Sequence, residues 1–131
     1  MLDARGRRPH DGTMVTPERA AKFAEEWIAA WNAHDLQRVL EHYDDDFEMA
    51  SPLIVDIAGE PSGVLRGKAR VGAYWEKALR LVPDLRFEKI LVLVGARSIA
   101  IHYRNQTGRL SVEVFEFGAD GRVARAAAHY A

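Results

Sequence analysis

The sequence predicts an α+β domain in which three helices, all in the N-terminal half, pack on a curved, mostly antiparallel sheet. Two observations support this fold class. Apolar residues recur at helical spacing in three segments before Pro83, and alternating strands separated by turn residues follow it. A short helical layer over a long curved sheet forms a cone with an apolar pocket. We therefore expect a small-molecule site.

The first two helices are predicted from their capping signals. Thr16-Pro17 combines a hydroxyl N-cap with a proline at the first helical position, and Ala20, Trp27 and Trp31 follow on one face. Asp35 caps a second helix. The run Asp44-Asp45-Asp46 is expected to close this helix and lead into a short strand over residues 47–51.

The rest of the chain is predicted as a loop, a helix and a strand meander. Residues 52–67 hold two prolines and three glycines without any period, so we expect a long loop at the mouth of the cone. A third helix spans about 68–82 and stops at Pro83. Asp120-Gly121 is a strong hairpin signal. The predicted strands are residues 85–94, 98–105, 109–117 and 122–130.

Length and composition limit the architecture to one domain of 131 residues. We expect residues 1–15 to be a flexible N-terminal tail and residues 16–131 to be the domain, with Met14 as an alternative start to Met1. The first residues lack the apolar segment of a signal peptide, so a cytoplasmic protein is expected. The net charge of −1, without charge clusters, argues against nucleic-acid and membrane partners.

Several chemistries are excluded by what the sequence lacks. There is no cysteine, which rules out disulfides and thiol nucleophiles. No phosphate-binding or dinucleotide-binding motif is present, so no cofactor is expected. The five histidines do not stand in a metal-ligand pattern, and three consecutive aspartates cannot all point at one ion. We therefore expect no metal site.

Four groups of residues carry a family resemblance: Trp31-Asn32-Ala33-His34-Asp35, Tyr43-Asp44-Asp45-Asp46-Phe47, Arg66-Gly67-Lys68, and Phe115-Glu116-Phe117 with Asp120-Gly121-Arg122-Val123. In order and spacing the chain resembles the nuclear transport factor 2-like superfamily, and most of all its bacterial SnoaL-like branch of polyketide cyclase and ketosteroid isomerase relatives. The resemblance covers about residues 17–130 and implies the cone fold. Fold alone does not fix function.

The resemblance places residues at the catalytic positions of these enzymes. Ser51, in Ala50-Ser51-Pro52, falls where the steroid isomerases carry a general-base aspartate. Trp27 falls on their oxyanion-binding tyrosine and Glu113 on their protonated aspartate. In the cyclases the acid/base aspartate matches Ala128. The resemblance thus implies a pocket but neither chemistry in its standard form.

Glu113 is the predicted catalytic residue. Alternation along residues 109–117 places it on one face with Ser111 and Phe115. A lone carboxylate between apolar neighbours loses hydration, which raises its pKa and suits a general acid or base. In the alternative reading Glu113 faces solvent or a second subunit and pairs with Arg104 or Arg125, since a register slip of one residue reverses the face.

Other residues on the same faces are predicted to line the pocket. Tyr103 and Tyr130 could orient a polar ligand atom, or could be ordinary core or rim aromatics. Trp31 and Trp75 could also line the pocket wall, but tryptophans at helical spacing are more often core residues, which is the role expected for these two. The predicted lining set is Trp27, Ser51, Tyr103, Phe115, Ala126, Ala128 and Tyr130.

Three functions remain open at this point. The first is a cofactor-free isomerase or cyclase acting on a small hydrophobic carbonyl compound. The second is a non-catalytic module that binds an apolar ligand, and the third is a structural dimer without ligand. Under all three, the apolar alternate faces of the strands (Val112, Val114 and Ile90 or Leu91) predict a homodimer through the outer sheet face.

Overall fold

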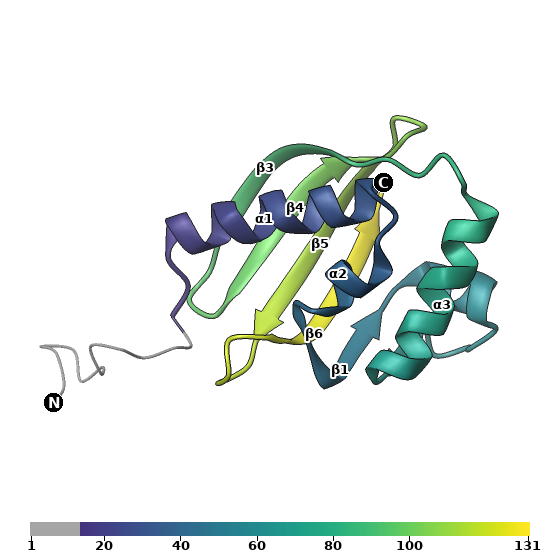
Figure 1. The fold of residues 1–131 in the computed structure, drawn as a ribbon, viewed down its shortest axis with the longest axis horizontal. Coiled ribbons are helices and arrows are strands. Elements are labelled where there is room, and N and C mark those ends of the chain that lie inside the picture. Colours follow the sequence, from purple (N-terminus) through teal and green to yellow (C-terminus); the bar gives the residue numbers. More distant parts are fainter. Residues whose placement is uncertain (1–13) are drawn as a thin grey trace, which may run out of the picture.

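The structure is a computed structural model that describes residues 14–131 (Figure 1). The expected tail lies outside the described residues except for its last two. Of these, Val15 is buried, and its backbone N–H donates to the Ala96 carbonyl oxygen over 3.0 Å. The packed region therefore reaches back at least to Val15. Among the described residues, no helix is long and apolar enough to cross a membrane.

Six strands form one mixed sheet in the order β2-β1-β6-β5-β4-β3. The last four strands make an antiparallel meander, as predicted, whereas β1 pairs with β6 in parallel. The α+β fold class is therefore confirmed. The strands are β1 (Tyr43–Ala50), β2 (Val64–Arg66), β3 (Glu88–Val94), β4 (Ser98–Arg104), β5 (Leu110–Phe117) and β6 (Val123–Tyr130).

The helices cover the inner face of the sheet (Figure 1). Helix α1 (Pro17–Asn32) lies across the meander, and α3 (Lys68–Leu81) packs against β1. The capping predictions hold. The Thr16 hydroxyl accepts from the Arg19 backbone N–H over 3.1 Å, and Asp35 does the same for Arg38 over 3.2 Å at the start of α2 (Leu36–Leu40). These caps satisfy backbone donors that the first helical turns leave free.

The predicted end of the second helix is wrong. Strand β1 begins at Tyr43, so Asp44, Asp45 and Asp46 belong to the strand rather than to a helix terminus. The pairing of β1 with β6 shifts register between Tyr43 and Glu48. This irregularity breaks the two-residue alternation and leaves Asp45 and Asp46 exposed while Tyr43 stays buried.

The predicted loop over residues 52–67 is also only partly right. It contains a short π-helical turn, η1 (Ile54–Ala58), and strand β2. Strand β2 has three residues and exists because it pairs with β1, where Leu65 lies opposite Met49. Gly59 ends η1 in the left-handed region, with φ of 71°. Tertiary pairing, which local sequence does not show, creates order in this segment.

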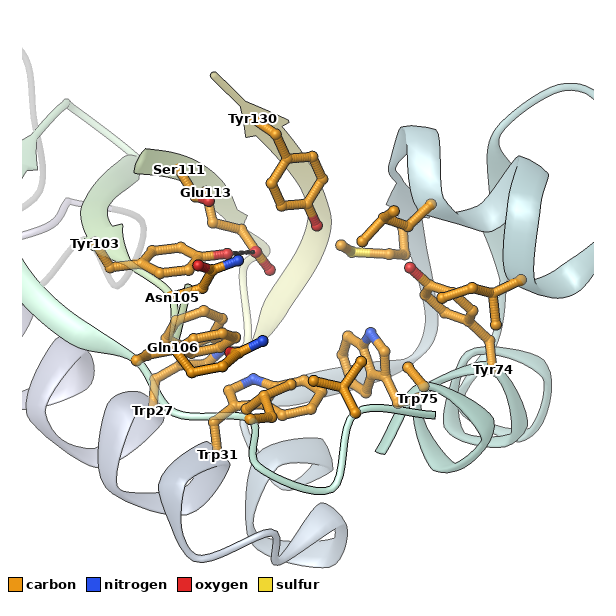
Figure 2. Close-up of a pocket in the computed structure, with 17 residues that line it drawn as sticks. Trp27, Trp31, Tyr74, Trp75, Tyr103, Asn105, Gln106, Ser111, Glu113 and Tyr130 are labelled. Atoms are coloured by element: carbon orange, nitrogen blue, oxygen red, sulfur yellow. Dashed lines mark hydrogen bonds between the residues drawn. The ribbon is translucent and has the colours of Figure 1, made fainter. Parts of the chain in front are cut away.

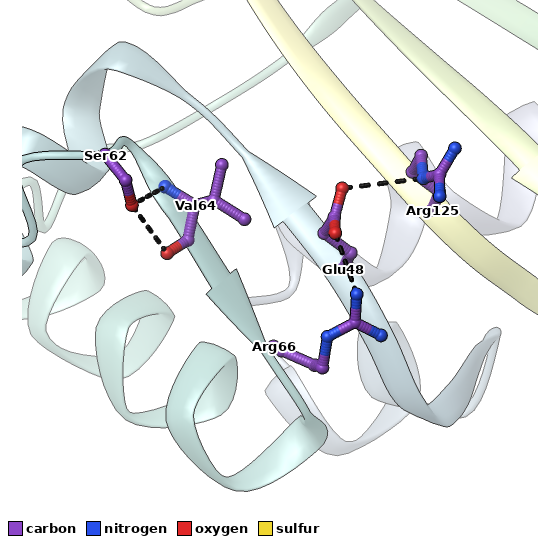
Figure 3. A network of polar contacts seen from close by, with 5 residues as sticks. All are labelled: Glu48, Ser62, Val64, Arg66 and Arg125. Atoms are coloured by element: carbon purple, nitrogen blue, oxygen red, sulfur yellow. Dashed lines mark hydrogen bonds and ion pairs between the residues drawn. The ribbon is translucent and has the colours of Figure 1, made fainter.

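A polar network joins β1 to both of its neighbours (Figure 3). Glu48 lies opposite Arg66 of β2 and Arg125 of β6 in the strand registers. Its carboxylate accepts from Arg66 over 2.9 Å and lies 3.5 Å from the Arg125 Nε. Exposed ion pairs contribute little stability, so this network mainly favours the observed register.

Candidate functional site

A cavity of about 130 Å³ lies between the inner face of the sheet, α1 and α3 (Figure 2). Aliphatic side chains from η1, α3 and the segment before β3 complete a mostly apolar wall. The rest of the wall consists of aromatic and polar residues. The aromatic residues are Trp27, Trp31, Tyr74, Trp75, Phe87, Tyr103 and Tyr130, and the other polar residues are Asn105, Gln106, Ser111 and Glu113.

Glu113 is buried, with 4% of its surface exposed, and lines this cavity. Alternation along β5 directs it inward with Ser111 and Phe115, whereas Val112 and Val114 are only partly buried on the other face. The Tyr103 hydroxyl donates to Glu113 Oε1 over 3.2 Å. Burial raises the pKa of Glu113 to about 7, even though the hydrogen bond from Tyr103 lowers it. Both protonation states are therefore accessible near neutral pH.

Tyr130 and Tyr74 present further hydroxyl groups to the cavity (Figure 2). The Tyr130 hydroxyl lies 3.5 Å from Ser51 Oγ. Burial raises the pKa of Tyr74 to about 12 and also raises the pKa of Tyr130. Both phenols therefore stay protonated near neutral pH, which makes them hydrogen-bond donors rather than bases.

Trp27 lines the cavity with its ring and not with its polar edge. Its indole N–H donates to the Tyr43 hydroxyl over 3.0 Å, in the buried core. Its ring stacks on Phe87 at a centroid distance of 5.6 Å and meets the edge of Tyr103 at the same distance. Trp27 is thus committed to packing, and its N–H is already satisfied.

Four residues of the predicted lining set do not reach the cavity. Phe115 is packed beneath α1, with ring centroids 5.0 Å from Phe23 and 5.2 Å from Trp27, and Ala126 lies opposite it in the strand register. Helix α1 fills the space there, so the small alanine opens no cavity. Ser51 and Ala128 line a separate, shallow hollow on the surface.

Ser51, the position implied for the base, serves the local backbone. Its Oγ accepts from the Leu53 N–H over 3.1 Å at the start of the turn into η1. The Ser51 side chain is only 4% exposed, and its hydroxyl is engaged by the Leu53 N–H and the Tyr130 hydroxyl. No carboxylate stands at this position, and the acidic side chain that lines the cavity is Glu113.

Several residues of the cavity wall lie outside the predicted lining set. Trp31 and Trp75 were expected to be core, and their rings do touch at 5.2 Å, yet both also face the cavity. Asn105 and Gln106 come from the turn between β4 and β5. Only the position of that turn at the sheet end could have suggested them.

The histidines within residues 14–131 lie away from the cavity wall. His102 and His129 are on the outer sheet face, with β5 between their strands. His34 has φ of 56° at the corner after α1, and its Nε2 lies 2.8 Å from the Leu85 carbonyl oxygen. His10 is outside the described residues. Within residues 14–131, no three histidine or acidic side chains come together as a metal-binding group.

Comparison with known proteins places this arrangement in a family. The family model of the SnoaL-like domain matches residues 24–126, which is most of the chain. The chain belongs to the SnoaL-like domain family. No curated protein matches the sequence.

Solved structures with similar folds include one of high sequence identity. A SnoaL-like protein of unknown function from Burkholderia thailandensis is 62% identical, with a TM-score of 0.86, and the match covers 90% of this chain and 98% of that one. IdmH from Streptomyces antibioticus, a candidate polyketide cyclase, is 16% identical, with a TM-score of 0.70 over 86% of this chain and 91% of its own. AclR from Streptomyces galilaeus, a candidate hydroxylase, is 20% identical, with a TM-score of 0.68 over 88% and 91%. The last two show the fold alone.

The geometry of this SnoaL-like cavity suits proton transfer on an apolar molecule. One titratable carboxyl lies in a mostly apolar wall, to which hydroxyl and indole groups also belong. A carboxyl with a pKa near the working pH can both accept and return a proton.

Proposed function

We propose that the cavity binds a small hydrophobic carbonyl compound and that Glu113 acts on it as a cofactor-free general acid and base. The single observation that carries this proposal is the buried Glu113 carboxyl at the cavity wall, held by the Tyr103 hydroxyl with a pKa of about 7. The reaction class is an isomerisation or cyclisation that begins with removal of a proton next to the carbonyl.

The proton transfer balances without a further reactant. The Glu113 carboxylate takes the proton from the carbon beside the carbonyl, and the electron pair of the broken C–H bond forms a C=C bond. The carbonyl π pair moves to oxygen, which gives an enolate. The enolate then re-forms the carbonyl as the Glu113 carboxyl returns the proton to another carbon, which moves a double bond and restores the carboxylate.

Isomerisation of 3-cyclohexen-1-one to 2-cyclohexen-1-one, followed by ultraviolet absorbance, tests this proposal. Because general acid–base catalysis contributes about 100- to 10,000-fold, Glu113→Gln is expected to lose at least about 100-fold in rate. Glu116→Gln is the matched control, since Glu116 lies on the same strand but is exposed. Equal rates in wild type and Glu113→Gln would contradict a catalytic role.

A non-catalytic binding module is the second candidate. The observation in its favour is Ser51, which occupies the implied base position and is engaged with the Leu53 backbone. In this case the enone would bind in the cavity but would not isomerise. The structural-dimer alternative has less support, since the cavity is not filled by side chains.

We also propose that the outer face of the sheet forms a homodimer. An apolar row crosses all six strands in matched register: Val64, Ala50, Ala127, Val114, Ala100 and Leu93. Leu93 is 59% exposed at the end of this row. Large exposed apolar patches mark interaction sites.

Sedimentation tests the dimer. Leu93→Lys is expected to shift the protein to monomer. Leu81→Lys, on α3 and 60% exposed, is the control and should leave the assembly unchanged. A wild-type monomer at high concentration would refute this interface. The expected cytoplasmic location stays a prediction.

A further inference from the structure

The described residues leave two buried side-chain polar atoms without a hydrogen-bond partner, and both residues line the same cavity. These atoms are Trp31 Nε1 and Ser111 Oγ. Native proteins pair nearly all of their buried polar groups, and an unpaired buried donor costs about 1–3 kcal/mol. Two such atoms at one cavity point to an occupant that supplies their partners.

Trp31 is held so that its indole N–H cannot turn away to find another acceptor. Its side chain is buried, and its ring lies 5.2 Å from Trp75, 5.8 Å from Phe87 and 6.2 Å from Trp27, measured between centroids. In Figure 2 the indole nitrogens of Trp31 and Trp75 face the side of the cavity where Glu113 and Tyr130 lie. The rigid packing of these rings therefore fixes a donor at the cavity wall.

Trp27 provides the contrast within the same helix. Its indole N–H is satisfied by the Tyr43 hydroxyl at 3.0 Å. The family resemblance placed an oxyanion donor at Trp27, but the buried indole N–H without a partner in this helix is that of Trp31, one helical turn further on. The Trp27 N–H is used within the core, whereas the Trp31 N–H is left for a ligand.

Ser111 lies on the opposite wall, two residues from Glu113 on β5. Burial raises the pKa of Tyr103, and the nearby Ser111 hydroxyl lowers it by a smaller amount. The two hydroxyl groups are nevertheless not in hydrogen-bonding geometry, so the Ser111 hydroxyl has no partner among the described residues. A hydroxyl can donate and accept. The wall around Glu113 can therefore take a second polar atom of a ligand.

The size of the cavity limits what fits inside. Its volume is about 130 Å³. An engineered apolar protein cavity of about 150 Å³ binds benzene. The enclosed part of a ligand is therefore about one six-membered ring, and a molecule of four fused rings does not fit within this wall.

We propose that the ligand places a single ring bearing a carbonyl group in this cavity and that the Trp31 indole N–H donates to the carbonyl oxygen. The inference rests on the proposed function, in which Glu113 meets the carbon beside that carbonyl. Charge that develops on the oxygen during proton removal would then be stabilised by a preorganised donor. Trp31 takes the place of the oxyanion-binding group.

A matched ligand pair tests this role. Cyclohexanone and methylenecyclohexane have nearly the same shape, but only the ketone can accept a hydrogen bond. The chain has three tryptophans, so a ¹H–¹⁵N spectrum of ¹⁵N-labelled protein holds three indole N–H signals, and the Trp31 signal reports on its hydrogen bonding. We expect cyclohexanone to move the Trp31 signal downfield and methylenecyclohexane to leave its proton shift nearly unchanged.

The Trp31→Phe variant identifies the Trp31 indole signal by its loss and measures the hydrogen bond to the ketone. A net hydrogen bond is worth about 0.5–1.5 kcal/mol, so the variant should bind cyclohexanone about two- to tenfold more weakly and methylenecyclohexane equally well. If the variant does not fold, the wild-type spectra still decide, with the Trp31 signal assigned by its contacts to both Phe87 and Trp75, since Trp27 contacts Phe87 as well. A Trp31 signal that stays in place while cyclohexanone saturates the cavity overturns the inference, as does an equal loss of both ligands.

This outcome is separate from that of the proposed function. A ketone that moves the Trp31 signal but is not isomerised supports the inference and refutes catalysis by Glu113. Isomerisation that survives Trp31→Phe at full rate supports Glu113 and refutes Trp31. A four-ring ketone that moves the Trp31 signal at lower concentration than cyclohexanone overturns the size limit.

Discussion

The side chain of Asn32 forms two hydrogen bonds with the backbone of Phe87. Its Nδ2 donates to the Phe87 carbonyl oxygen over 2.9 Å, and its Oδ1 accepts from the Phe87 N–H over 2.7 Å. His34 contacts the Leu85 carbonyl oxygen from the same corner. The corner after α1 thus fixes the segment that carries Phe87 into the cavity wall.

Asn32→Ala should lower the free energy of unfolding by about 1–3 kcal/mol, because the Phe87 backbone loses both partners in a partly buried position. Urea denaturation measures the loss. Asn32→Asp keeps the acceptor but not the donor, so its loss should be smaller than that of the alanine variant. Equal stability of all three proteins would show that the pair does not hold the corner.

The stability of the wild type should fall as the pH rises from 5 to 8. Glu113 has a pKa of about 7 in the folded protein against an ordinary 4.5, so the folded state binds the proton more tightly. The stabilisation of the folded state by the protonated Glu113 is complete below pH 4.5 and is lost as the pH rises through 7. In Glu113→Gln this decrease of the unfolding free energy with pH should be absent. Between pH 5 and pH 8 the variant should therefore gain about 2–3 kcal/mol of stability relative to the wild type.

Denaturation at several pH values measures this difference, with Glu116→Gln as an exposed control that should keep the wild-type slope. A constant difference between Glu113→Gln and wild type from pH 5 to 8 would mean that the carboxyl is ionised throughout. Glu113 would then not be poised for proton transfer near neutral pH.

Tyr103→Phe should raise the pKa of Glu113 further. The Tyr103 hydroxyl donates to Glu113 Oε1, and this bond favours the charged form. Titration of the ¹³C-labelled carboxyl by NMR follows the change. Tyr130→Phe is the comparison, since the Tyr130 hydroxyl contacts Ser51 instead, and it should shift the titration less. A lower pKa in Tyr103→Phe would contradict the hydrogen bond.

Tyr43→Phe should destabilise the protein by about 1–3 kcal/mol, because it leaves the Trp27 N–H buried without an acceptor. A double-mutant cycle with Trp27→Phe isolates the bond from the packing of the two rings. If the two substitutions are additive, the hydrogen bond contributes nothing to stability.

The sequence predicted the parts of the fold that local rules control. Thr16 and Asp35 cap helices as expected, and alternation along β5 directs Glu113 inward. Strand β2 was missed because it forms through pairing with β1. The start of β1 was missed since a register shift exposes Asp45 and Asp46 in a strand.

The candidate site was predictable only in part, since helical spacing shows which face a residue takes but not whether that face is filled. Trp31 and Trp75 share their faces with core residues, and the gap that they border depends on how far α3 stands from the meander. For the same reason Phe115 and Ala126 were assigned to the pocket, although α1 packs directly over them.

Hydrogen exchange beside the carbonyl of cyclohexanone, followed by NMR in D₂O, measures whether Glu113 removes this proton, and it does so without requiring a product. We predict protein-dependent exchange whose rate rises with pH to a plateau, with a midpoint near pH 7, and a loss of at least about 100-fold in Glu113→Gln. Exchange at the same rate in Glu113→Gln, or none in either protein while the ketone is bound, would contradict it.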